Sequence, residues 1–294
     1  MSEKRISYAK SYPNGISISS SNYPEVSIKV YQDEDGKRHH LILPTEYFDL
    51  FSQEIFEDKA FKTGRICILI FDILLILTLF LLKMYTQIIV AIFFAATSTK
   101  LADFIVAIYV LKHTKSGKDT ARFHAAEHMS INAYHKYQRI PTITEIKHSS
   151  RFSDICGSVG FAKLALIPSL FYTIYLLSQL LVQDHTARFI LMTLDVVLTL
   201  FLLFSKKLFT YFQIFLTAPP TDNEIMLAID VLKGYELFEK VFGVDEQDKQ
   251  EDYSPLEEYF DHAKITKTED AKLDIEFDDG NLGLEIEFIE RKKE

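Results

Sequence analysis

The chain has 294 residues, of which 48% are hydrophobic and 25% are charged, and its formal net charge at pH 7 is −9. The mean hydropathy is slightly positive although a quarter of the residues carry charge, so the apolar residues must be concentrated in blocks. The acidic balance argues against a nucleic-acid-binding protein, and a total of two cysteines argues against a disulfide-stabilised domain.

The first segment, residues 1–64, is predicted to contain a β-hairpin followed by a helix. Val26, Ile28 and Val30 alternate as in a half-buried strand, and β-type residues resume from His40 after the turn Asp33–Gly36. Residues 46–62 place phenylalanines among acidic residues. We expect an amphipathic helix on the membrane surface there, with an ordinary packing helix as the alternative.

Four apolar blocks follow in two close pairs. Each approaches or exceeds the ~20 residues that a helix needs to cross ~30 Å of hydrocarbon. A buried helix of a soluble domain could imitate one block, but four such blocks predict transmembrane helices in residues 65–112 and 159–206. The blocks are Ile66–Leu82, Ile88–Leu111, Val159–Val182 and Ala187–Phe204.

Charged residues indicate how these helices are oriented. Lysine and arginine are concentrated before the first block and in residues 113–158, and Lys206 and Lys207 follow the fourth block. The positive-inside rule then places both termini and the 113–158 loop in the cytoplasm. Three aspartates and Lys163 lie within the blocks, where charged groups usually face a helix-bundle interior; for Lys163 we expect its ammonium to reach the interface.

The cytoplasmic loop carries the most chemically informative motif. Residues 121–137 are rich in alanine and free of proline and glycine, which predicts a helix that ends before Pro141. His124, Glu127 and His128 follow the order H-x-x-E-H, which puts two imidazoles and a carboxylate on one helix face. Such a pair of histidines can bind one divalent metal, and the carboxylate can act as the catalytic base. The alternative is a polar face whose histidines hydrogen-bond to a neighbouring segment.

Further ligands are available in the same loop. His135 lies two turns beyond His128, and Thr142 with Glu145 forms a capping-box pattern that predicts a second short helix. We therefore predict a metal site of His124 and His128, completed by His135, Glu145, His148 or Asp154, with zinc favoured over iron. Cys156 could be a ligand, although a small buried residue beside Gly157 is the simpler interpretation.

The C-terminal part is predicted to be cytoplasmic. Residues 207–242 contain an apolar segment that is too short to span the membrane, and then a helix that begins near Asp222. The tail, residues 243–294, is strongly acidic and shows a second hairpin pattern around Asp278–Asn281. Its charge suits solvation or the docking of a partner protein rather than anionic lipid or nucleic acid. The expected fold is therefore a mainly α polytopic membrane protein with about four transmembrane helices, a cytoplasmic helical loop and small terminal β-hairpins.

Several ordered motifs resemble one bacterial family. The segment FHAAEHMSINAY, Phe123–Tyr134, is similar to the F-H-G-A-E-H-K-T-I-x-A-Y signature of YqhQ-like membrane proteins, domain of unknown function 1385. Cys156-Gly157-Ser158 resembles the C-G-T of that family. A later L-Q-x-x-T-T-x-x-P-D block of the family is matched by Gln213, Thr217, Pro220, Asp222 and, further on, Ala228. The resemblance implies a predicted metal-dependent enzyme in the bacterial cytoplasmic membrane, with no assigned reaction.

The chain also departs from the family pattern. Ser153-Asp154-Ile155-Cys156-Gly157 stands where the family has H-x-R-C-G, so that the histidine and the arginine of this element are missing. Ile16–Ser21 stands where the family has E-G-V-M-M-R. We therefore expect a divergent member that either uses other ligands or has lost the chemistry.

Three functions are compatible with these patterns. The first is a membrane-embedded zinc hydrolase in which Glu127 is the general base. The second is a non-enzymatic membrane factor that binds a partner protein through its cytoplasmic loop and acidic tail. The third is a di-iron lipid hydroxylase or desaturase, which is the weakest because the loop offers only four histidines after Lys118. We favour a metal-binding, hydrolase-like membrane protein; the oligomeric state does not follow from the sequence.

Overall fold

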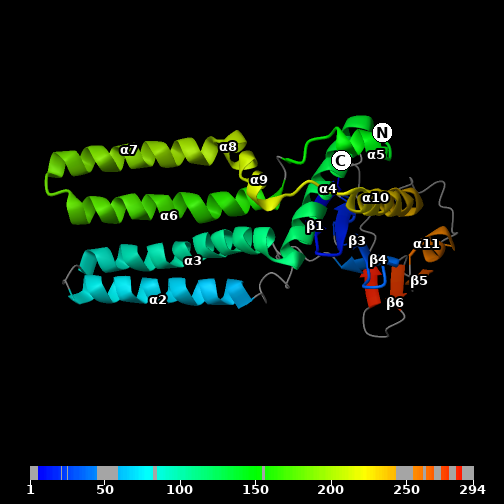
Figure 1. Ribbon diagram of the computed structural model, residues 1–294, viewed down its shortest axis with the longest axis horizontal. Helices are drawn as coiled ribbons and strands as arrows, with labels where there is room; N and C mark the ends of the chain where they lie inside the picture. The colour runs from blue at the N-terminus through cyan, green and yellow to red at the C-terminus, as the bar shows by residue number, and fades with distance from the viewer. Residues whose placement is uncertain are drawn as a thin grey trace. The chain divides into compact units, whose positions relative to one another are not determined.

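The computed structural model describes residues 6–20, 22–24, 26–44, 59–81, 85–153, 156–242, 254–260, 263–267, 273–277 and 283–286. The chain divides into two compact units. The strand-containing unit comprises Met1–Phe48, Arg122–Arg151 and Pro219–Glu294, and the helical unit comprises Asp49–Ala121 and Phe152–Ala218. Helices predominate over strands, which confirms the predicted mainly α class (Figure 1).

An antiparallel sheet forms one layer of the strand-containing unit. Its strands are β1 (Ile6–Ser11), β2 (Gly15–Ser20), β3 (Val26–Gln32) and β4 (Arg38–Pro44), in that spatial order. The predicted hairpin is confirmed as β3–β4, with Val30 opposite His40 and with Gly36 at φ 82° in the turn. β1 and β2 extend this hairpin. In β2 isoleucines alternate with serines, as in a strand with one apolar face, and both faces are buried in the structure.

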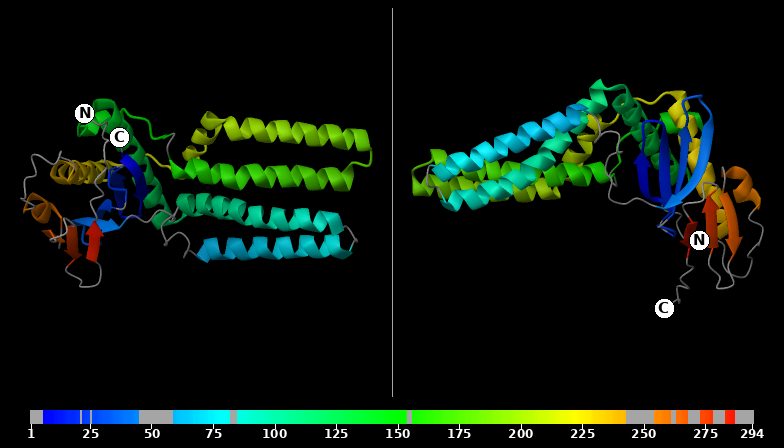
Figure 2. Two further views of the ribbon diagram at one scale, coloured as in Figure 1. Left: turned by 180° about the vertical axis from the view of Figure 1, so that it is seen from behind. Right: turned by 90° about the horizontal axis from the view of Figure 1, so that it is seen from below.

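Two helices cover one face of this sheet. The core joins the sheet residues Ile18, Ile28 and Val30 to Phe123 of α4 (Lys115–Tyr137) and Tyr235 of α10 (Asp222–Phe242). Figure 2 shows α10 lying along the sheet. Burying each large apolar side chain stabilises the fold by about 1.5–3 kcal/mol, so this core fixes α4 against the sheet. The helix predicted to begin near Asp222 is confirmed as α10.

The helix that carries H-x-x-E-H begins six residues earlier than the predicted start at Ala121. It starts at Lys115, directly after Thr114, whose hydroxyl accepts a hydrogen bond from the backbone N–H of Gly117 at 3.0 Å. This is the role of a threonine at a helix N-cap, and it satisfies a backbone donor that the first turn would otherwise leave free. Short-range capping by Thr114 therefore extends the predicted helix.

The remaining elements of this unit are short. α5 (Ile143–Lys147) has the predicted capping box between Thr142 and Glu145, and α11 (Ser254–Tyr259) lies near the C-terminal end. The predicted C-terminal hairpin is confirmed as β6 (Leu273–Phe277) with β7 (Gly283–Ile286), and β5 (Ala263–Lys267) pairs with β6 to complete a three-stranded sheet. The predicted helix at 46–62 falls largely outside the described residues, which resume at Lys59.

The helical unit is built from the four apolar blocks, each of which forms a helix. These are α2 (Lys59–Leu81), α3 (Tyr85–His113), α6 (Gly157–Leu181) and α7 (His185–Phe204), followed by the short α8 (Lys206–Tyr211) and α9 (Gln213–Leu216). α2 packs on α3, α3 on α6 and α6 on α7, so the long helices form a row (Figure 1). Within the described part of the chain, Gly157–Gln179 and His185–Phe204 are long and apolar enough to cross a membrane.

Charged groups inside this unit are largely paired or capped. Asp103 of α3 forms an ion pair with Arg65 of α2, with 2.9 Å between Oδ1 and Nε. Lys163 of α6 donates through Nζ to the carbonyl oxygen of Leu203 at 2.9 Å, near the C-terminus of α7. A cation at this end of a helix complements its partial negative charge. Asp72 and Asp195 are buried.

The backbones of α3 and α4 approach each other closely at Gly117. A Cβ at this position would overlap the backbone carbonyl of Val110, whereas a Cβ at Gly160 of α6 would meet nothing within 4 Å. We predict that Gly117→Ala destabilises the protein by about 1–3 kcal/mol, because the α3–α4 joint must open. The matched change Gly160→Ala should be neutral or stabilising by up to about 1 kcal/mol, from helix propensity alone. Thermal unfolding of both variants in the same detergent tests this, and equal effects would contradict the close approach.

Candidate metal centre

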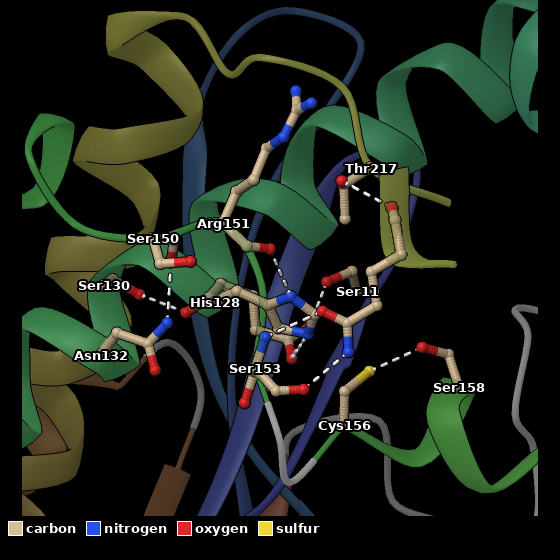
Figure 3. A network of polar contacts seen from close by, with 12 residues as sticks. Ser11, His128, Ser130, Asn132, Ser150, Arg151, Ser153, Cys156, Ser158 and Thr217 are labelled. Carbon is tan, nitrogen blue, oxygen red and sulfur yellow. Dashed lines mark hydrogen bonds and ion pairs between the residues drawn. The ribbon is translucent and has the colours of Figure 1, made fainter. Parts of the chain in front are cut away.

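The His128 side chain is held by the backbone of a loop that returns to α4. Its Nδ1 lies 2.8 Å from the carbonyl oxygen of Arg151. A carbonyl oxygen only accepts, so Nδ1 must carry the hydrogen and the neutral ring then keeps its lone pair on Nε2. One turn further along α4, the amide of Asn132 donates to the carbonyl oxygen of Ser150 at 2.8 Å. These two contacts hold the loop against α4 and fix the orientation of the imidazole (Figure 3).

The second nitrogen of His128 is buried and has no hydrogen-bond partner. The side chain is 2% exposed, and Nε2 is one of the few buried polar atoms of the described residues that lack a partner. Leaving such an acceptor unsatisfied costs about 1–3 kcal/mol. A histidine whose Nδ1–H is fixed by a carbonyl and whose Nε2 is free has the arrangement that metal-binding histidines usually show.

His124 lies one turn before His128 on the same face of α4. Their ring centroids are 4.4 Å apart, and His124 is less deeply buried than His128. The helix therefore presents two imidazoles together, as the i, i+4 spacing predicts. The small buried residues Ala125 and Ala126 beside them let α4 pack closely in its unit.

Glu127 is buried beside these histidines, and its two oxygens have different surroundings. Oε1 lies 3.9 Å from Nε2 of His128, while Oε2 accepts a short hydrogen bond from the hydroxyl of Ser11 in β1. Burial raises the pKa of the Glu127 carboxyl above its ordinary value, because the charged form loses hydration. The nearby His124 and the Ser11 hydroxyl act in the opposite direction.

Two parts of this arrangement could not be found from sequence patterns. Ser11 is a single serine at the end of a strand that the sequence did not predict, and nothing in its neighbourhood distinguishes it from the serines of β2. The Arg151 contribution comes from a backbone carbonyl, which every residue has. The return of the loop to α4 brings the Arg151 carbonyl to His128, and the packing of the sheet against α4 brings Ser11 to Glu127.

Each of the other predicted ligands that the structure describes makes local contacts of its own. Glu145 caps α5 at Thr142 and pairs with Arg139, with 2.6 Å between Oε1 and Nη2. His148 is exposed, and its Nδ1 lies 2.7 Å from the carbonyl oxygen of Thr144. His135 lies seven residues beyond His128, about 10 Å along the helix axis, near the ring of Tyr134. Asp154 lies outside the described residues.

Cys156 belongs to the helical unit, where it stands at the N-cap of α6. Its thiol lies 2.9 Å from the hydroxyl of Ser158, and it is one of two free cysteines (Figure 3). In the same unit, the side chain of Gln213 bridges the backbone of Ser153 by accepting from its N–H and donating to its carbonyl, at 2.8 and 2.6 Å. The backbone of Ser153 is thus anchored to α9.

The fold and this site define a mainly helical protein with a candidate metal centre on the H-x-x-E-H helix. Residues 26–236 match the family described as protein of unknown function (DUF1385), and the chain belongs to this family. The match covers β3 to α10 and so includes the whole H-x-x-E-H helix. No curated protein and no solved structure matches the chain.

The ion pair between Arg139 and Glu145 predicts a pH dependence. The guanidinium and the cap at Thr142 lower the pKa of the Glu145 carboxyl from 4.5 to about 2. A depressed pKa means that the ion pair stabilises the fold above pH 4.5, and that this stabilisation is lost as the pH falls towards 2. Glu145→Gln should therefore lower the melting temperature at pH 6 but have progressively less effect below pH 4.5.

Arg139→Gln should reproduce the same pH profile, because it removes the other half of the pair. Thermal unfolding of the wild type and both variants across this pH range gives the comparison. A loss of stability in Glu145→Gln that is independent of pH would contradict the ion-pair assignment.

Proposed function

We propose that this protein is a membrane-embedded, metal-dependent hydrolase in which His124 and His128 bind zinc and Glu127 is the general base. The observation that carries the proposal is the state of His128, whose Nδ1–H is fixed by the Arg151 carbonyl while its buried Nε2 has no partner. A divalent ion would satisfy this nitrogen. Binding by a second imidazole, 4.4 Å away between ring centroids, would then cost little reorganisation because both rings extend from one helix.

We infer Cys156 as a further ligand. It follows Arg151 by five residues, a length of chain that can span up to about 17 Å, so the fixed Arg151 carbonyl limits how far the thiol can be from His128. Two imidazoles and one thiolate suit zinc, and a three-ligand set leaves a coordination position for water or substrate.

The residues around the imidazoles support hydrolysis rather than a purely structural ion. When bound, zinc would supply Lewis acidity for a polarised substrate oxygen and for an attacking water. Glu127 would accept a proton at Oε1, the oxygen near His128, while the Ser11 hydroxyl holds Oε2 in place. Burial raises the pKa of Glu127, which makes its carboxylate a stronger base than an exposed one.

The helical unit supports membrane insertion of four helices. Large apolar side chains on α2 and α7 are exposed, among them Phe71 at 57%, Phe189 at 73% and Phe201 at 63%. Water-facing surfaces rarely carry contiguous apolar patches of this kind, whereas lipid-facing helices require them. With the distribution of lysine and arginine, we propose four spans and cytoplasmic positions for both termini and for α4.

A non-enzymatic membrane factor is the competing proposal, and the acidic tail from Gly243 favours it. In that case the histidines and Glu127 would be packing and hydrogen-bonding residues. The two proposals differ in what they require of Glu127. An enzyme needs this carboxylate for turnover, whereas a binding factor tolerates its replacement if the fold is kept.

The metal assignment predicts a specific pattern of zinc content. Purified wild-type protein should contain about one zinc per chain, and His124→Ala or His128→Ala should reduce this severalfold. Glu127→Gln should keep the metal, because a base is not needed for coordination, and should abolish any hydrolytic activity. His148→Ala is the matched control, since it removes an exposed histidine of the same loop and should leave the zinc content unchanged.

Metal analysis by mass spectrometry, with circular dichroism to confirm folding, measures these contents. Zinc that remains stoichiometric in the His124→Ala, His128→Ala double variant would refute the proposed centre. Full function of Glu127→Gln in cells, together with failure of a chain truncated at Asp245, would favour the partner-binding factor.

The four-span arrangement predicts which loops face the outside. A cysteine placed at Thr186, in the first turn of α7, should react with a membrane-impermeant maleimide in intact cells. A cysteine at Ser116, at the start of α4, should react only after the membrane is opened. Both positions are exposed, so accessibility differs only through the membrane. The unmodified chain supplies the background from Cys67 and Cys156, and labelling of the Ser116 variant in intact cells would overturn the orientation.

A further inference from the structure

The helical unit contains an open apolar groove where α6 meets the ends of its neighbours. The groove has a volume of about 360 Å³, which is in the range of small-ligand sites. Its walls come from α3, α6, α7, α8 and the residue that follows α8. The residues that line it are Leu101, Leu166, Ser169, Leu170, Thr173, Leu202, Leu208, Phe209 and Phe212.

The two hydroxyl groups in the lining have no hydrogen left to donate to a ligand. Ser169 donates to the carbonyl oxygen of Ala165 at 2.7 Å, and Thr173 donates to that of Ser169 at 2.6 Å. Both bonds stay within α6. An ordered water needs two to four polar partners, so water is a poor occupant of this groove. The rest of the lining is leucine and phenylalanine, so a hydrocarbon chain matches this groove best.

One end of the groove carries a positive charge. Lys163, Leu166 and Leu170 share one face of α6, with Lys163 at its N-terminal end. The Lys163 Nζ lies 5.5 Å from the ring centroid of Phe209, a residue of the groove wall. Its contact with the Leu203 carbonyl uses one of the three ammonium N–H donors, so two donors can serve an anion.

The face of α6 that runs from Lys163 along the groove is an apolar stripe, and its length limits the length of the ligand. Ten residues separate Lys163 from Thr173, about 15 Å along the helix axis. This is half of the ~30 Å hydrocarbon thickness of a bilayer, the depth of one leaflet. A charge at one end of an apolar stripe of this length matches a phospholipid whose acyl chain occupies a single leaflet.

We propose that this groove binds one acyl chain of an anionic phospholipid, with the lipid phosphate on the ammonium of Lys163. The inference rests on the proposed membrane placement of α6 and α7, and it is independent of the metal. It adds a bound lipid as a second ligand of the protein, held by charge at the headgroup and by apolar contact along the chain.

The complete absence of tryptophan from the chain gives a direct test. A single tryptophan at Leu208, which lines the groove and is 43% exposed, becomes the only indole fluorophore. The full chain is reconstituted in phosphatidylcholine vesicles that contain lipid with brominated acyl chains, either phosphatidylglycerol or phosphatidylcholine. Phe212→Trp is a second reporter in case Leu208→Trp folds poorly, and Phe189→Trp on the exposed face of α7 reports bulk lipid.

We expect brominated phosphatidylglycerol to quench the groove reporter severalfold more strongly than brominated phosphatidylcholine at the same mole fraction. Phe189→Trp should be quenched equally by both. Lys163→Gln should remove the headgroup preference of the groove reporter, whereas Lys207→Gln, an exposed lysine of α8, should keep it. Ser169→Leu, which fills the groove, should weaken quenching by both lipids.

Several results would overturn the proposal. Equal quenching of the groove reporter by both lipids, or a preference that survives Lys163→Gln, would mean that no anionic lipid is selected. No quenching of the groove reporter would make the groove a packing void. No quenching of Phe189→Trp would remove the membrane placement on which the inference rests, while leaving the zinc content of the protein as a separate question.

Discussion

The hydrogen bond between the His128 ring and the Arg151 carbonyl determines what α4 can do chemically. It selects the tautomer with the hydrogen on Nδ1, and so leaves the lone pair on the buried Nε2, 3.9 Å from Oε1 of Glu127. Without this bond the ring could rotate or exchange tautomers, and the unpaired buried nitrogen would have no defined orientation. The contact from Asn132 to the Ser150 carbonyl supports it, because it holds the same loop one turn further along the helix.

The sheet supplies the second constraint on the site. Ser11 reaches Glu127 because β1 pairs with β2 and the isoleucines of β2 and β3 pack against α4 and α10. An apolar core of this kind is stiff, and the side chains of the candidate site on α4 therefore gain orientation from packing that lies outside the motif. The residues of the proposed site are thus distributed over a helix, a strand end and a returning loop.

Sequence reasoning predicted the elements whose signals are local. The four apolar helices, the β3–β4 hairpin, the capping box of α5 and the H-x-x-E-H face all follow from periodicity or from residues a few positions apart. The isoleucine–serine alternation of β2 is a strand signal of the same local kind, but the pairing of β1 with β2 did not follow, because β1 has no regular alternation of apolar and polar residues. Ser11 and the Arg151 carbonyl did not follow either, since they meet α4 only through long-range folding. The family match covers the H-x-x-E-H helix but assigns no ligand to this chain.

The central claim is that Nε2 of His128 is a metal ligand. X-ray absorption at the zinc edge of the purified, zinc-loaded protein tests it directly. The account predicts imidazole nitrogen scattering at about 2.0–2.1 Å from two histidines, and sulfur at about 2.3 Å if Cys156 completes the set. In His128→Ala the imidazole contribution should fall to that of one histidine. A zinc shell with no imidazole, or one that is unchanged in His128→Ala, would contradict the account.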